Sequence, residues 1–122
     1  MFKPKDMESE KLPFQIGEQY EKWEFDLEVL QDRINGYDSY KYIGIEFNSF
    51  LNYLPDETEL IFNLDVLECV LFIFKNKNEH FYEIIELTLR ANKNLSWTFR
   101  GKDLYVGYGN LNLINRIFND IL

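Results

Sequence analysis

The sequence predicts an α+β protein, an antiparallel sheet of about five or six strands with helices packed on one face. Three observations support this prediction. Apolar and polar residues alternate along several short segments, as they do in half-buried strands. Turn residues separate two pairs of these segments. Two further segments repeat apolar residues at the three- and four-residue spacing of an amphipathic helix. Strands with helices kept to one side are typical of the α+β class.

A chain of 122 residues, 46% of them hydrophobic and 28% charged, is long enough to bury one core and corresponds to one domain. Residues 1–15 are polar, lack periodicity and contain two of the three prolines. We therefore expect a loosely ordered arm over 1–15 and a single α+β domain over 16–122.

The first predicted β-hairpin covers residues 20–47. In the segment KWEFDLEV (22–29), every odd position is apolar and every even position from 24 to 28 is acidic. A three-residue loop at 34–36, with Gly36 left-handed, pairs this strand with a returning strand at 43–47. That register sets Trp23 opposite Phe47 and Leu27 opposite Ile43, so that the apolar residues share one face.

Residues 16–34 have an alternative interpretation as an amphipathic helix. Apolar residues recur there at spacings of four and three, at Ile16, Tyr20, Trp23, Leu27, Leu30 and Ile34. The helix leaves Phe25 and Val29 on its wet side, whereas the strand buries both. Trp, Phe and Val also prefer strands, so the strand is favoured while the helix stays open.

The second half of the chain has clearer signals. Residues 60–74 are strand-like, as two strands or one bent strand, because the alternation slips near residues 66–67. A helix near 79–91 has Asn78 as its cap, with an extended conformation as the alternative. A hairpin at 95–108 turns at Gly101-Lys102 and pairs Arg100 with Asp103. A C-terminal helix at 111–121 follows a cap at Asn110.

The charge of this protein is concentrated in its first half. The net charge is −8; residues 1–61 hold 14 acids and 6 bases, whereas residues 62–122 hold 7 of each. A negative field repels nucleic-acid backbones and anionic lipid, so we expect no direct nucleic-acid binding and no membrane binding. The same field attracts a basic protein partner.

The sequence holds no catalytic motif, and we expect no catalytic residues, no metal site and no cofactor. His80 and Cys69 are the only residues of their kinds, so they cannot assemble a zinc site. Cys69 lies in an apolar run, which indicates a buried side chain and a cytoplasmic, reducing location. No apolar run is long enough to span a membrane, and the N-terminus does not resemble a secretory signal.

The wet face of the first predicted hairpin is the candidate partner-binding surface; the alternative is an ordinary solvated sheet face, acidic because the whole first half is acidic. Its carboxylates suit Arg and Lys, and its tyrosines offer large, rigid contacts. Gly44, opposite Asp26, leaves a gap for a partner side chain. The six predicted partner-binding residues are Glu24, Asp26, Glu28, Tyr40, Tyr42 and Glu46.

Size, acidity and this surface favour a small, non-enzymatic protein-binding module. The specific hypothesis is an immunity- or antitoxin-like inhibitor of bacterial type that masks a basic partner such as a nuclease toxin. One alternative is a homo-oligomeric or accessory structural subunit, for example a homodimer joined through an exposed strand. Another alternative is a small-ligand binder or a carboxylate-based enzyme, which requires a cleft that shifts a carboxyl pKa.

Overall fold

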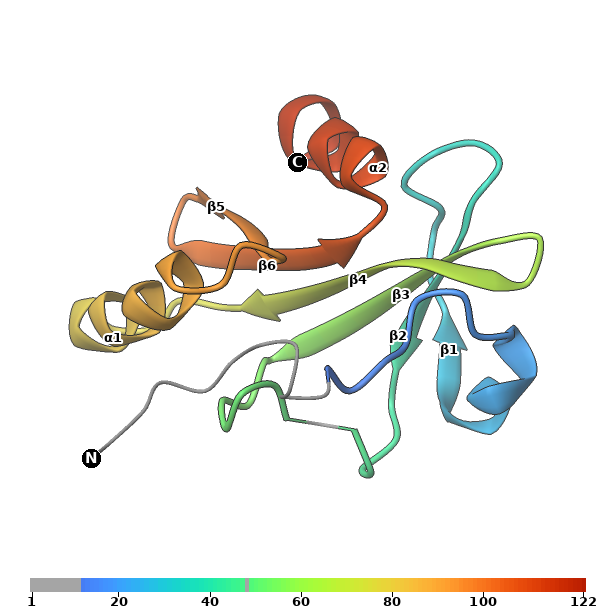
Figure 1. Cartoon of the computed structure of the whole chain (residues 1–122), viewed down its shortest axis with the longest axis horizontal. Coiled ribbons are helices and arrows are strands. Elements are labelled where there is room, and N and C mark those ends of the chain that lie inside the picture. The colour runs from blue at the N-terminus through green and yellow to red at the C-terminus, as the bar shows by residue number, and fades with distance from the viewer. Residues whose placement is uncertain (1–11, 48) are drawn as a thin grey trace.

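A single antiparallel sheet runs through the molecule (Figure 1). The computed structural model describes residues 12–47 and 49–122, and within these residues the sheet has six strands in the order β1-β2-β3-β4-β6-β5. The predicted α+β class and antiparallel sheet are confirmed. The strands are β1 (Leu27–Val29), β2 (Asp38–Tyr42), β3 (Glu57–Asn63), β4 (Val66–Phe74), β5 (Ser96–Arg100) and β6 (Asp103–Gly109).

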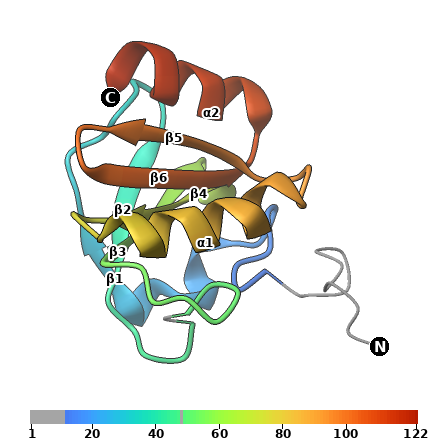
Figure 2. The same ribbon diagram turned by 90° about the vertical axis from the view of Figure 1, so that its left-hand side faces the viewer.

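Two α-helices pack on opposite faces of the sheet, α1 (Glu79–Arg90) and α2 (Leu111–Arg116), which continues as a π-helical turn over Ile117–Ile121. Leu60 and Val70 lie in the core beneath α1, whereas Ile61 and Leu71 lie in the core beneath α2. Figure 2 shows the two helices separated by the β5–β6 hairpin. The expectation that both helices pack on one face is wrong. The central strands β3 and β4 are apolar at consecutive positions, so both faces of the sheet need a cover.

The β3–β4 hairpin accounts for the slip in the alternation of residues 60–74. Two strands meet there at a tight turn, whose residues Leu64 and Asp65 have φ of 50° and 67°. Ile61 pairs with Cys69 but Phe62 pairs with Leu67, so β4 contains one extra residue. The bulge shifts the alternation by one residue, so that Leu67 before it and Val70 and Phe72 after it lie in the same core.

The predicted second hairpin and both helix starts are confirmed. Arg100 pairs with Asp103 across the Gly101-Lys102 turn, and φ of Gly101 is +61°. The side chain of Asn78 accepts a hydrogen bond from the Phe81 amide at the start of α1. Asn110 does the same for the Leu113 amide at the start of α2. Each contact satisfies an amide that the first turn of a helix leaves free.

The first hairpin differs from the prediction over 20–47. Residues 20–22 and 24–26 form 3-10 turns, β1 has three residues, and Leu27 pairs with Tyr42 instead of Ile43. Trp23 is buried against Phe14 and Phe62, whereas Phe25 is 90% exposed. Of the alternating run, the core therefore buries Trp23 fully and Leu27 in part. Residues 16–34 do not form an α-helix either, so that alternative is also wrong. Its helical spacing did, however, place Phe25 on the solvent side, where the structure has it.

Phe14, near the start of the described residues, belongs to the core. Its side chain is fully buried and its ring packs edge-on against Trp23 and Tyr42. The Tyr108 hydroxyl donates to the Phe14 carbonyl at 2.6 Å and accepts from the Phe14 amide at 3.1 Å. Leu12 and Phe14 are therefore packed against the core, whereas Gln15 is exposed, and the expected loose arm over 1–15 stays a prediction. Residues 1–11 of that arm lie outside the described residues.

Candidate protein-binding edge

The six residues predicted to bind a partner do not share one face of the sheet. Glu28 lies opposite Lys41, and Tyr40 lies opposite Val29. Residues directly opposite in an antiparallel pair project to the same face, so Glu28 and the tyrosines project to opposite faces. Tyr42 is buried, and Tyr40 packs against Tyr20 and Phe62. The predicted register was off by one residue, and a shift of one residue exchanges the two faces.

Three of the predicted residues, Tyr42, Asp26 and Glu46, do lie near one another. The Tyr42 hydroxyl accepts a hydrogen bond from the Phe47 amide at 3.3 Å. Burial raises the pKa of Tyr42, and the carboxylates of Asp26 and Glu46 raise it further. A side chain at Gly44 would meet the Tyr42 hydroxyl and the Asp26 carboxylate. The gap at Gly44 is therefore filled from within the chain, and the idea that a partner side chain enters it is wrong.

The face that holds Glu28 is one of paired charges. Glu28 lies opposite Lys41 on β2, and Lys41 lies opposite Glu59 on β3. Arg33, from the loop before β2, binds the Glu59 carboxylate with hydrogen bonds of 2.8 Å from Nε and Nη2. Two acids and two bases alternate across this corner of the sheet. On this face Glu28 therefore has a basic neighbour, and the Glu59 carboxylate is neutralised by Arg33.

Exposed apolar side chains lie just before β1, at its last residue and in the segment that follows β2. Phe25 and Ile45 are 90% and 85% exposed, and Val29 is 77% exposed. The Ile43 amide donates to the Asp26 carbonyl at 2.8 Å, which keeps the two segments adjacent beyond the last paired residues. We define the β1 edge as these apolar residues with their acidic neighbours, namely Glu24, Phe25, Asp26, Glu28, Val29, Ile43, Ile45 and Glu46.

The apolar members of the β1 edge were not among the predicted site residues. The strand interpretation assigned Phe25, Val29, Ile43 and Ile45 to the core, which removed them from any surface. The helical pattern left Phe25 and Val29 on the wet side, and that was the one signal for them in the sequence. Apolar side chains that cluster at a surface, with polar residues around them, mark interaction sites more often than single exposed ones do.

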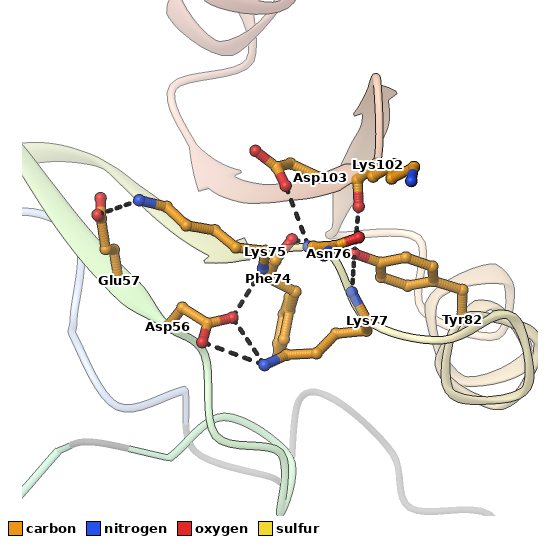
Figure 3. Close-up of polar contacts among 9 residues, drawn as sticks. All are labelled: Asp56, Glu57, Phe74, Lys75, Asn76, Lys77, Tyr82, Lys102 and Asp103. Atoms are coloured by element: carbon orange, nitrogen blue, oxygen red, sulfur yellow. Dashed lines mark hydrogen bonds and ion pairs between the residues drawn. The ribbon is translucent and has the colours of Figure 1, made fainter.

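A second polar cluster joins β3, β4, α1 and the β5–β6 turn (Figure 3). Asp56 accepts hydrogen bonds from the Lys75 amide at 2.7 Å and from the Lys77 ammonium at 3.1 Å. Glu57 forms an ion pair with the Lys75 ammonium. The Tyr82 hydroxyl, from α1, donates to the Lys102 carbonyl at 2.6 Å and accepts from the Lys77 amide.

These contacts make the cluster a structural junction. Partial burial acts to raise the pKa of Asp56, but the hydrogen bonds and charges of Lys75 and Lys77 lower it on balance. The hydrogen bond from Lys75 to Glu57 raises the pKa of Lys75. Lys75 and Lys77 are thus engaged by carboxylates of the same chain. The junction fixes α1 against the end of the β5–β6 hairpin.

Metal-ligating side chains do not gather in the described part of the chain. Within 12–47 and 49–122, no three His, Cys, Asp or Glu side chains gather as a metal site would require. Cys69 is fully buried, which raises the pKa of its thiol strongly and keeps it protonated. The helices in this part of the chain are all too short or too polar to cross a membrane.

No family model, curated protein or solved structure matches this chain. The observations that bear on function are therefore the α+β fold, the distribution of charge and the β1 edge.

Proposed function

We propose that this protein is a small protein-binding module that uses the β1 edge to cover a basic partner. The observation that supports the proposal is the exposure of Phe25, Val29 and Ile45 beside acidic side chains. Protein interfaces combine a central apolar contact with a polar rim. At the β1 edge, Phe25 and Ile45 supply the apolar contact, and Asp26, Glu28 and Glu46 supply the rim.

The acidic rim favours a positively charged partner protein. Residues 1–61 hold the whole excess negative charge of the chain, and the β1 edge lies among them. Such a field accelerates the encounter with a positively charged protein and disfavours an acidic one. A nuclease is positively charged where it binds nucleic acid. An immunity- or antitoxin-like inhibitor of a nuclease-type toxin, acting in the reducing cytoplasm of a bacterium, is the specific form of the proposal.

The experiment uses the basic protein that co-purifies from the native host, or that is encoded beside this gene. Its affinity for this chain is measured by surface plasmon resonance over a series of salt concentrations. Reversal of Glu24, Asp26 and Glu28 to Lys is expected to slow association and to remove most of its salt dependence. Asp120→Lys, at an exposed position in the C-terminal turn, is the control for a general change of charge.

Two results would count against the proposed surface. One is unchanged affinity and salt dependence in the triple variant. The other is an equal loss per reversed charge in Asp120→Lys and in Glu28→Lys, because each substitution changes the net charge by the same amount. That result would mean that total charge, and no particular edge, attracts the partner.

A homo-oligomeric subunit is the second candidate function. The sheet ends at β1 on one side and at β5 on the other, and an exposed strand edge can pair with another chain. Sedimentation velocity over a hundredfold range of protein concentration separates the two candidates. A dimer that persists through the range supports the subunit, and a monomer supports the free binding module.

A further inference from the structure

A groove of about 510 Å³ lies at the opposite end of the sheet from β1, between α1 and the β5–β6 hairpin. Figure 2 shows α1 running alongside this hairpin. One wall is acidic and comes from α1, the floor is aromatic, and Lys102 lies at the turn end. The side chains that matter here are Glu79, Tyr82, Glu83, Glu86, Phe99 and Lys102.

The acidic wall is only partly neutralised. Glu86 forms an ion pair with Arg90 at 3.2 Å, whereas Glu79 and Glu83 form none with any cation in the described part of the chain. An acid in the first turn, such as Glu79, stabilises a helix through its dipole. That explanation does not extend to Glu83, which lies in the second turn.

Just beyond the Glu86 end of the groove, the chain already places a cation over an aromatic ring. The Arg90 guanidinium lies 5.4 Å from the centre of the Trp97 ring while it pairs with Glu86. Two residues further along β5, on the same face, the Phe99 ring packs edge-on against Tyr82 at 5.1 Å. Here the aromatic ring and the acidic wall recur, but no cation of the described residues lies over the ring, although Lys77 and Lys102 also line the groove. A positive side chain from outside would complete the same arrangement.

The strand beside the groove has a free edge. In the described sheet β5 pairs only with β6. Arg100 and Asp103 flank a two-residue turn, so the backbone groups of Trp97 and Phe99 point away from β6. Arg100 Nη1 donates to the Phe99 carbonyl at 2.9 Å, which covers one of these outward groups. A strand added at this edge would project every second side chain toward α1.

The groove is held in shape at its turn end. Tyr82 donates to the Lys102 carbonyl at 2.6 Å, and the Asn76 amide donates to Asp103 Oδ1 at 3.1 Å (Figure 3). The first contact ties the β5–β6 turn to α1 itself, and the second ties it to the segment before α1. A groove that is fixed before binding loses less entropy when a peptide enters it.

We propose that this groove binds an extended, basic segment of a partner protein, which adds to the edge of β5. A Lys or Arg side chain of that segment lies on Phe99, between the carboxylates of Glu79 and Glu83. A second copy of this chain suits the groove less well, because pairing through β5 would set two acidic walls against each other. This groove and the β1 edge are separate surfaces, so neither proposal depends on the other.

The probe is a blocked octapeptide of alternating Lys and Thr, titrated into the ¹⁵N-labelled full chain and followed by NMR. We expect saturable shifts at Phe99, Gly101 and residues 79–86. An octapeptide of alternating Glu and Thr should cause none of these shifts. Glu83→Lys should weaken binding roughly tenfold, whereas Asp120→Lys and Glu28→Lys should leave it unchanged. A peptide N-methylated at every second residue should lose binding, because it cannot pair with β5.

Several results would overturn the proposal that this groove binds a basic segment. They are the absence of saturable shifts, shifts confined to the β1 edge, equal shifts with the Glu peptide, or no effect of Glu83→Lys. Sedimentation of the peptide-free protein tests a second copy as the occupant. A dimer that the Lys peptide fails to dissociate, with Phe99 already shifted on dimerisation, would assign the edge of β5 to self-association. If partner binding is lost only in variants of the β1 edge, that result does not count against peptide binding in the groove.

Discussion

Arg33 holds Glu59 with one hydrogen bond to each carboxylate oxygen, both of 2.8 Å. The Glu59 side chain is only 4% exposed and that of Arg33 is 23% exposed. Burial alone would lower the pKa of Arg33, but the hydrogen bond and charge of Glu59 raise it on balance. This pair connects the loop before β2 to the centre of β3, and it neutralises the carboxylate that would otherwise dominate that face.

Arg33→Met is expected to reduce the free energy of unfolding by about 3 kcal/mol, because it leaves the buried Glu59 carboxylate without a partner. The double variant Arg33→Met, Glu59→Leu should recover much of this loss. Urea denaturation of the three proteins measures both values. If the double variant is less stable than Arg33→Met, the cost does not come from an unpaired charge.

Phe25→Ser tests the β1 edge without disturbing the core. Phe25 is 90% exposed, so we expect a change in stability within about 0.5 kcal/mol. Loss of a central apolar contact should weaken binding of the basic partner by about tenfold or more. Leu87→Ser, at an exposed position on α1, is the matched control and should bind normally. Equal affinities of both variants would remove Phe25 from the interface.

Asp56→Asn tests the junction through its pH dependence. The folded state lowers the pKa of Asp56 below 3.8, so the unfolded state binds more protons between the two pKa values. The contribution of this carboxylate is therefore complete above the unfolded pKa and is lost as the pH falls through the folded pKa. The variant should be less stable than the wild type at pH 7, and the difference should shrink in acid. Chemical denaturation from pH 7 to pH 2 measures this, and a constant difference would contradict it.

Tyr108→Phe removes the hydroxyl that serves both backbone groups of Phe14. The amide and carbonyl of Phe14 then remain buried without that partner, and we expect a loss of about 1–3 kcal/mol. Hydrogen exchange of the Phe14 amide should quicken in the same variant. Unaltered exchange would show that Tyr108 does not hold the segment around Phe14 to the sheet.

The second half of the protein was predicted closely because its signals are local. The Gly101-Lys102 turn sets the pairing of Arg100 with Asp103, and Asn78 and Asn110 cap their helices through neighbouring amides. Each of these features involves residues no more than a few positions apart. Such contacts depend little on where the rest of the chain lies.

The first half was predicted poorly because its conformation depends on distant partners. Trp23 turns inward to meet Phe14 and Phe62, and the 3-10 turns around it follow from that packing. Alternation alone could not show that β2 ends at Tyr42, which leaves Ile43 and Ile45 in water. The candidate acidic face depended on the register, and the register was the least local feature of all.

The sequence by itself determined the α+β class, the β5–β6 hairpin, both helix caps and the concentration of negative charge in residues 1–61. These follow from composition and from short-range hydrogen bonding. Only the tertiary structure decided that the helices cover opposite faces, that Arg33 neutralises Glu59, and that Phe25 and Val29 face solvent beside their acidic neighbours. Those outcomes depend on contacts between residues far apart in the chain, where packing of the core outweighs the preference of any single segment.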